Sequence, residues 1–206
     1  YDVDEWTGTI KASYFVADSL HVYGTLDRGY RPGAANFDTT GVFTPDFNAY
    51  DGETVHSFEI GAKGDVMDGR GRYTAAFFYS VYEDYQTQVN FEAYNLIEEE
   101  VETITNAPYV NVDEAVQAGI EADFRVLVNE NWSMYMGATY VKVEFTDGTL
   151  PCTDPSQPPV GPNNRYNTCD ADGETASPQP EWTAVFQTEY QWPQAIANSD
   201  AYVSAL

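Results

Sequence analysis

Apolar and polar residues alternate along most of this chain with a period of two. The segment 116–128 is the clearest case. Its even positions are all apolar, and its odd positions hold Gln117, Gly119, Glu121, Asp123 and Arg125, with Leu127 as the exception. Successive side chains of a β-strand point to opposite faces, so this pattern predicts a strand with one apolar and one polar face.

The same alternation predicts strands at 8–16, 20–30, 56–66 and 181–192, and a further strand that begins at Ala201. Two other strands are less regular. The run that ends near Gln86 has Phe78 and Tyr82 on its polar side, and the strand from Trp132 changes parity near Tyr140. A β-bulge near Tyr140, or passage of the strand into a different environment, would explain the change. The fold class expected is all-β.

Short and long connections alternate between these strands. Those at 17–19, 65–71 and 129–131 are short, those at 31–54, 87–115 and 147–180 are long, and the one at 193–200 is shorter again. All long loops therefore lie at one end of an up-and-down antiparallel sheet of about eight strands. Outer-membrane barrels have this arrangement, with short periplasmic turns and long extracellular loops.

Strand length favours a membrane wall over a soluble sandwich. Soluble strands usually have about 5 to 6 residues, whereas a tilted strand that crosses a bilayer needs roughly 9 to 11. The segments 20–30 and 116–128 are long enough to cross. No uncharged stretch approaches the roughly 18 to 20 residues of a spanning helix. Aromatic residues near strand ends could form interfacial girdles: Tyr30, Trp132, Tyr140, Trp182, Tyr190 and Trp192. A soluble barrel would place its charges on the same face, so the pattern alone leaves both folds open.

Composition narrows the function classes. The chain has 33 acidic and 9 basic residues and a net charge of −24, which excludes a nucleic-acid partner because phosphate binding needs clustered Lys and Arg. Aromatic residues form 15% of the chain, too many for a disordered acidic tail. No export signal opens the sequence at Tyr1, and we expect that signal to be removed or to lie outside this segment.

Several segments together resemble the β-barrel of a TonB-dependent outer-membrane receptor. The stretch 20–33 reads LHVYGTLDRGYRPG and is followed by Asn36, and 57–64 reads SFEIGAKG. The segments 75–86, AGIE at 118–121 and GATYVKVEFTD at 137–147 are similar to later strands of the family, in the family's order. The resemblance implies part of a plugged barrel of about 22 strands. The plug domain, the energy-coupling box and a terminal aromatic strand are not recognisable, so we expect one part of the barrel wall.

The resemblance also implies a function. The expected protein is an outer-membrane receptor of a Gram-negative bacterium that takes up a scarce nutrient such as a siderophore or metal chelate. Its expected partners are outer-membrane lipid, a small-molecule ligand such as an iron chelate, and the TonB energy-coupling complex, reached through a plug outside this chain. The alternative is a passive porin-like protein or a structural, secreted acidic β-sheet. No nucleophile or phosphate-binding motif is present, so we expect neither catalysis nor a cofactor.

The first two long loops contain candidate ligand-binding residues. The first loop combines aromatic and acidic side chains, a mixture suited to an aromatic or cationic ligand: Phe43, Asp46, Phe47, Tyr50 and Asp51. Packing of the loop on itself is the alternative. In the second loop, Glu98, Glu99 and Glu100 could attract a cation through their field, although such a run can also be a solvated surface.

The third loop and the polar face complete the candidate residues. Cys152 and Cys169 predict a disulfide, with two free thiols as the alternative. The acidic residues around Gly173 lack the later ligands of a calcium loop, so no metal site is predicted. On the lumen face, Glu59, Lys63, Glu121 and Arg125 would bond to a plug, as the resemblance implies, or pair with each other across strands.

Overall fold

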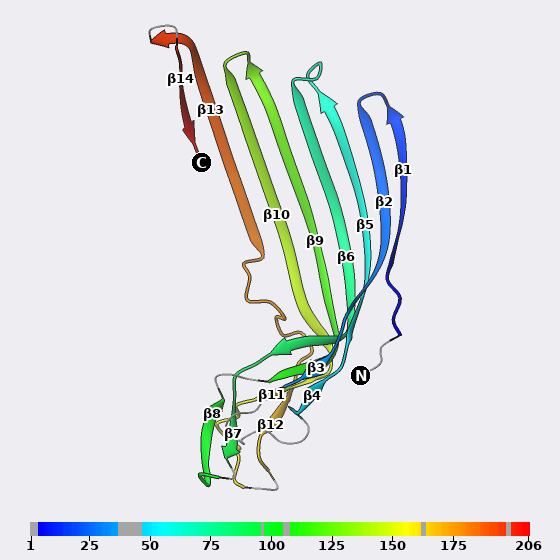
Figure 1. The fold of residues 1–206 in the computed structure, drawn as a ribbon, viewed down its shortest axis with the longest axis vertical. Helices are drawn as coiled ribbons and strands as arrows, with labels where there is room; N and C mark the ends of the chain where they lie inside the picture. The colour runs from blue at the N-terminus through cyan, green and yellow to red at the C-terminus, as the bar shows by residue number, and fades with distance from the viewer. Residues whose placement is uncertain (1–3, 37–46, 96, 105–107, 162–163, 197–198) are drawn as a thin grey trace.

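The computed structural model describes residues 4–36, 47–95, 97–104, 108–161, 164–196 and 199–206. One antiparallel sheet of eight strands dominates the structure, and its spatial order follows the chain (Figure 1). Its strands are β1 (Gly8–Ala17), β2 (Leu20–Arg31), β5 (Glu53–Val66), β6 (Gly71–Gln88), β9 (Tyr109–Asn129), β10 (Trp132–Asp147), β13 (Trp182–Ile196) and β14 (Ser199–Ala205). The predicted all-β, up-and-down sheet is confirmed. Among the described residues, no helix is long and apolar enough to cross a membrane.

The described parts of the three long connections, 32–52, 89–108 and 148–181, lie together at one end of the sheet, as predicted (Figure 1). We call them the cap. They contain three small two-stranded ladders: β3 (Ala34–Ala35) with β4 (Ala49–Tyr50), β7 (Phe91–Asn95) with β8 (Glu100–Ile104), and β11 (Thr149–Cys152) with β12 (Asn167–Asp170).

The predicted connection at 193–200 is wrong in its extent. Strand β13 continues through Pro193 to Ile196, and its pairing with β14 shifts register between Trp192 and Ile196. A proline cannot donate a backbone hydrogen bond to a sheet, so it is tolerated where the ladder is irregular. The irregular register explains why a proline that indicated a turn lies within a strand.

One face of the sheet carries a broad apolar band. Cross-strand partners share a face, and one such row consists of alanines on five neighbouring strands: Ala62, Ala75, Ala122, Ala138 and Ala184. In β6 the band runs from Gly71 to Val81, and the next residue on that face is Glu83. That span is about 34 Å along the strand, or about 26 Å after a tilt of roughly 40°, which matches the apolar height of about 25 Å of outer-membrane barrels.

The parity change in β10 marks the edge of this band. The pairing of β10 with β9 is regular from Ser133 to Phe145, so no bulge occurs near Tyr140. Beyond Tyr140, Lys142 and Glu144 form an ion pair on the formerly apolar face. On the other face, Phe145 is buried against Val112 of β9 and Ala171 of the third connection. The strand therefore leaves one environment for another, and the alternative of a bulge is wrong.

Aromatic side chains lie at both borders of the band. At the cap border, the ring centroids of Tyr140 and Trp182 are 4.8 Å apart. At the opposite border, those of Tyr190 and Trp192 are 4.7 Å apart, and Trp132 Nε1 donates to Thr188 Oγ1 over 2.8 Å. These positions suit rings that have one polar edge at a membrane interface.

The buried core of the described chain lies mainly in and beside the cap. Phe47, Phe91, Ala93 and Ile104 form one cluster, and Val112, Ala115, Phe145 and Ala171 form a second. Residues of the apolar band are far more exposed; Ile60 and Ile120 are each 52% exposed. No second layer of described residues covers the band.

A polar network attaches the first connection to β6. Arg31 contacts Glu53 Oε2 at 3.2 Å and donates to the carbonyl oxygen of Gln86 at 3.0 Å, and the Gln86 amide N–H donates to Glu53 Oε2 at 2.8 Å. Gln86 Nε2 lies 2.9 Å from the carbonyl oxygen of Asp51 and 3.2 Å from that of Pro32. Gln86 and Glu53 are buried, so this network fixes both ends of the connection.

The residues after Arg31 continue this attachment. A Cβ atom on Gly33 would lie 2.1 Å from the carbonyl oxygen of Tyr50, so only glycine allows β3 to approach β4 there. Asn36 Nδ2 donates to the carbonyl oxygens of Phe47 and Tyr109, and its Oδ1 accepts from the Tyr109 amide. The Arg-Pro-Gly segment and the asparagine of the resemblance thus tie the first connection to the start of β9.

We predict that a basic residue on the apolar face destabilises the intact protein in lipid vesicles, whereas its neighbour on the polar face tolerates one. Ile120→Arg should lower the free energy of unfolding by about 2 to 4 kcal/mol, the cost of an arginine at the bilayer midplane. Glu121→Arg, one residue away on the other face, is the matched control and should cost less. Denaturant titration measures both, and an equal or larger loss for Glu121→Arg would contradict the assignment of faces.

We also predict that Gln86→Leu loosens the first connection without harming the wall. The change leaves backbone carbonyl oxygens without their amide donor, a loss of about 1 to 3 kcal/mol for each buried polar group. Hydrogen–deuterium exchange should then accelerate in residues 31–53. Gln117→Leu removes one hydrogen bond from the Tyr82 hydroxyl within the wall and should leave that exchange unchanged. Indistinguishable exchange in the two variants would refute the network's role.

Candidate functional site

The cap combines strong negative charge with aromatic side chains. Its three connections contain 13 acidic residues and one basic residue, Arg165. A surface of one sign raises the local concentration of ligands of the opposite sign and accelerates their association. Any hollow in the cap therefore lies within a negative field.

One hollow of about 310 Å³ is formed by the first and third connections and the start of β9. Its lining includes Phe47, Tyr50, Asp51, Tyr109, Asn111 and Tyr166. The rings of Tyr50 and Tyr109 are 5.1 Å apart between centroids, and those of Phe47 and Tyr166 are 4.8 Å apart. We call this hollow the aromatic pocket. Its size and mixed lining are typical of a small-molecule site.

The aromatic pocket contains three of the residues that the sequence indicated in the first loop. Phe47 is only 7% exposed and packs in the cap core, whereas Tyr50 is half-buried and Asp51 is exposed. The other two, Phe43 and Asp46, lie outside the described residues. Tyr109, Asn111 and Tyr166 were missed because they are distant in sequence and carry no motif.

Asp51 is held in place through its backbone. Its amide donates to Asn111 Oδ1 over 2.7 Å, and Asn111 Nδ2 donates in turn to the carbonyl oxygens of Asp51 and Asp84. Partial burial raises the pKa of the Asp84 carboxyl, with smaller contributions from the nearby carboxylates of Asp51, Asp113 and Glu83. Several carboxylates are thus close enough to interact beside the aromatic pocket.

Burial also raises the pKa of Tyr85, and the negative charge of Glu53 adds to the effect. Tyr85 is in edge contact with Phe145, with ring centroids 5.8 Å apart. Its hydroxyl therefore stays neutral well above neutral pH, and Tyr85 packs against the buried cluster that contains Phe145.

The acidic residues of the second loop lie at the tip of the β7–β8 hairpin. Glu98, Glu99 and Glu100 are all exposed. Asn95 Oδ1 accepts from the amides of Ile97 and Glu98, which shapes the turn. Among the residues with described positions, no group of His, Cys, Asp or Glu side chains could hold a metal ion. The three glutamates therefore contribute charge to the cap without forming a coordination site there.

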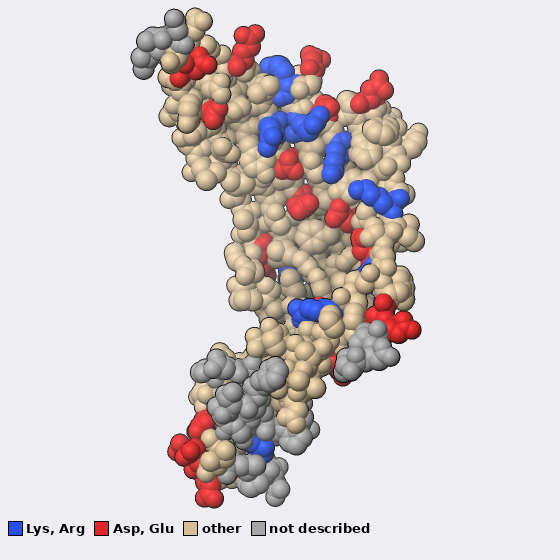
Figure 2. All heavy atoms as spheres, in the orientation of Figure 1, with Lys and Arg blue, Asp and Glu red and all other residues tan. Residues whose placement is uncertain are grey.

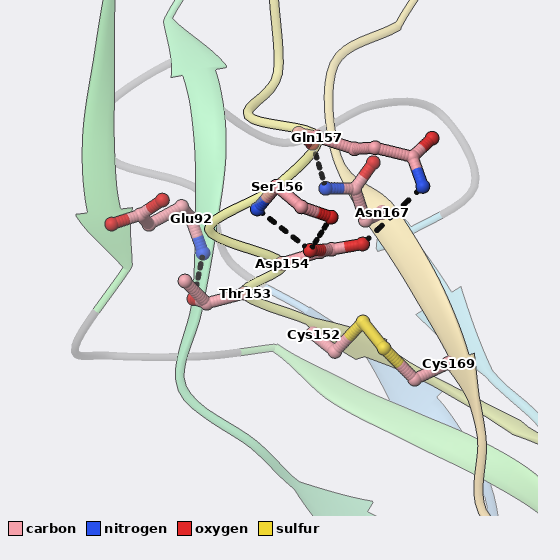
Figure 3. The surroundings of a disulfide bond; sticks show 8 residues. All are labelled: Glu92, Cys152, Thr153, Asp154, Ser156, Gln157, Asn167 and Cys169. Atoms are coloured by element: carbon pink, nitrogen blue, oxygen red, sulfur yellow. Dashed lines mark hydrogen bonds between the residues drawn. A yellow bond between two sulfur atoms is a disulfide. The ribbon is translucent and has the colours of Figure 1, made fainter.

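The third connection contains the Cys152–Cys169 disulfide, which confirms the predicted pairing (Figure 3). The bond joins β11 to β12 across 17 residues. Between them, Asp154 accepts hydrogen bonds from the hydroxyl and amide of Ser156, which lower the pKa of its carboxyl. Thr153 Oγ1 accepts from the Glu92 amide and so links this connection to β7.

The polar face of the wall carries Glu59, Lys63, Glu121 and Arg125, as the alternation of apolar and polar positions predicted. The Lys63 ammonium lies 5.2 Å from the centre of the Tyr23 ring, and the Arg125 guanidinium 5.5 Å from that of Tyr135. In the described part of the chain, the ion pairs at 4.0 Å or less involve none of these four residues.

Basic residues gather in the half of this face nearer the short turns (Figure 2). A shallow hollow of about 580 Å³ there is lined by Arg70, Arg72, Arg125, Gln187 and Glu189, among others. The two ends of the molecule therefore differ in charge, with an acidic cap and a more basic opposite half. Contacts to a plug stay a prediction for this face.

Comparisons with known proteins agree with this architecture. The family model described as TonB dependent receptor-like, beta-barrel matches residues 1–205. The ferric yersiniabactin uptake receptor FyuA from Yersinia pestis aligns with a TM-score of 0.61 and 18% identity, over 92% of this chain and 23% of that chain. The siderophore receptor PiuA from Acinetobacter baumannii aligns with a TM-score of 0.59 and 18% identity, over 96% of this chain and 28% of that chain.

The copper transporter OprC aligns with a TM-score of 0.52 and 14% identity, over 94% of this chain and 32% of that chain. No curated protein matches the sequence significantly. The chain thus spans less than a third of the length of these solved structures, and at such identities the likeness shows the fold. The family match itself covers nearly the whole chain. This protein therefore belongs to the TonB-dependent receptor β-barrel family, whose place is the outer membrane of Gram-negative bacteria.

Proposed function

We propose that this chain forms part of the wall and the ligand-capturing loops of a receptor for energised uptake of a scarce nutrient. The nutrient is a siderophore, a metal chelate or a similar small molecule that the cap binds on the extracellular side. The TonB complex supplies energy through a plug that fills the barrel lumen.

The observation that carries this proposal is the division of the chain into an amphipathic wall and a cap gathered over one end of it. A passive pore would need no cap in which the described parts of the three long connections pack together and a hollow lies between the first and the third. FyuA is a ferric yersiniabactin uptake receptor, PiuA is a siderophore receptor and OprC is a copper transporter, which supports metal-related nutrients as the class.

A passive porin-like protein or a secreted structural sheet is the second candidate. The exposed apolar band argues against a secreted sheet, because several Ile and Phe side chains would contact water. The family match argues against both.

We predict that uptake depends on the energy-coupling complex although surface binding does not. Cells that express the full-length receptor would be given ferric trihydroxamate, ferric catecholate or copper, each with a traceable metal label. One of these should accumulate inside the cells and should fall to background when the coupling gene is deleted, with binding at the cell surface retained. Accumulation that survives the deletion would overturn the proposal in favour of passive diffusion.

A further inference from the structure

The aromatic pocket has a composition that selects for a particular kind of ligand. Tyr50 and Tyr109 provide one pair of rings and Phe47 and Tyr166 another, and Asp51 adds a carboxylate. Among the described residues that line the pocket, none is basic. Aromatic faces attract cations through their quadrupole, most strongly where water is partly excluded.

The surroundings of the pocket strengthen the same preference. Asp84 interacts electrostatically with Asp51 and with Asp113, and Asn111 joins Asp51 to Asp84 through their backbone carbonyl oxygens. The hydrogen bonds of Asn111 and Asn36 hold β4 and the start of β9 together, so the tyrosine pair is positioned before any ligand arrives. An anionic ligand would have to enter against this field and would find no basic side chain in the described lining.

We infer that the aromatic pocket binds an organic cation, namely a quaternary or protonated ammonium group, whether free or carried by a larger nutrient. This inference rests on the proposed uptake function and specifies the class of ligand that the cap selects. The ammonium group lies against tyrosine rings, with Asp51 as its counter-charge, and the field of the remaining cap carboxylates draws it in.

The wall of the same chain already shows this type of contact. The ammonium groups of Lys11 and Lys63 lie 4.9 Å and 5.2 Å from the centre of the Tyr23 ring. In the wall, the cation comes from the protein itself. In the aromatic pocket, we infer that it comes from the ligand.

Equilibrium binding of choline to the purified full-length receptor tests the inference. The matched probe is 3,3-dimethylbutan-1-ol, which replaces the charged nitrogen of choline by carbon and keeps the shape. Calorimetry in a maltoside detergent avoids competition from phosphocholine head groups. Choline should bind at least about fivefold more tightly than its neutral counterpart, as expected for a cation–π contact assisted by a carboxylate.

Variants locate the binding. Tyr50→Leu keeps an apolar side chain but removes the ring and should weaken choline binding by about fivefold, whereas Tyr50→Phe should retain it. Asp51→Asn should weaken it, and Glu98→Gln, which removes a charge at the exposed hairpin tip, should change it by less than about twofold. Tyr94→Leu, elsewhere in the cap, controls for general effects of losing a tyrosine.

Equal affinity for the two probes, an absence of choline binding, or full binding by Tyr50→Leu would each overturn the inference. A drop of the same size in Glu98→Gln and Asp51→Asn would also overturn it, because the cap field alone would then explain the attraction. Choline binding needs no energy source. If choline does not bind but uptake still depends on the coupling complex, the inference about the aromatic pocket is wrong and the proposed function is unaffected.

Discussion

Contact between one face of the sheet and lipid hydrocarbon is the constraint on which the rest of this structure depends. Side chains such as Ile10, Leu26 and Phe77 are 72%, 56% and 42% exposed on this face. Leaving one large apolar side chain in water instead of burying it forfeits about 1.5 to 3 kcal/mol. Repeated over the eight strands of the sheet, that loss would exceed the roughly 5 to 15 kcal/mol by which a typical domain is stable. A bilayer removes the penalty and also explains why charges appear at the cap border, where the band ends.

The membrane constraint separates the two parts of the chain physically. Wall strands satisfy their backbone groups by pairing with neighbours, which a bilayer requires because it offers no water to unpaired groups. Strands β1 and β14 are the outer members of the sheet, and their free edges call for further strands in a closed barrel. The cap lies in water and is held by its own apolar clusters, the Gln86 network and the disulfide. The cap and the wall are therefore stabilised by separate interactions.

The sequence predicted the wall well because period-two alternation, once a face meets lipid, fixes which side chains share that face. It also predicted the Cys152–Cys169 bond and the end of the sheet where the long loops lie. The extent of β13 was missed because Pro193 lies at an irregularity that no local pattern reveals. The aromatic pocket was only half predictable: Tyr50 and Asp51 are close in sequence, but Tyr109 and Tyr166 reach them through tertiary folding. Arg31, Glu53 and Gln86 likewise form a network only once three strands are in register.

A spin-label scan of β9 from Val116 to Val126 in lipid vesicles tests whether the apolar face of the sheet meets hydrocarbon. Each residue of this segment would carry the label in turn, in the full-length receptor. The relaxation of the label would be measured with oxygen, which concentrates in hydrocarbon, and with a water-soluble nickel chelate. If this face meets lipid, even positions such as Ile120 and Ala122 are accessible to oxygen, and odd positions such as Glu121 and Asp123 are not. A scan without this alternation, or with nickel accessibility at the even positions, would contradict contact between this face and lipid.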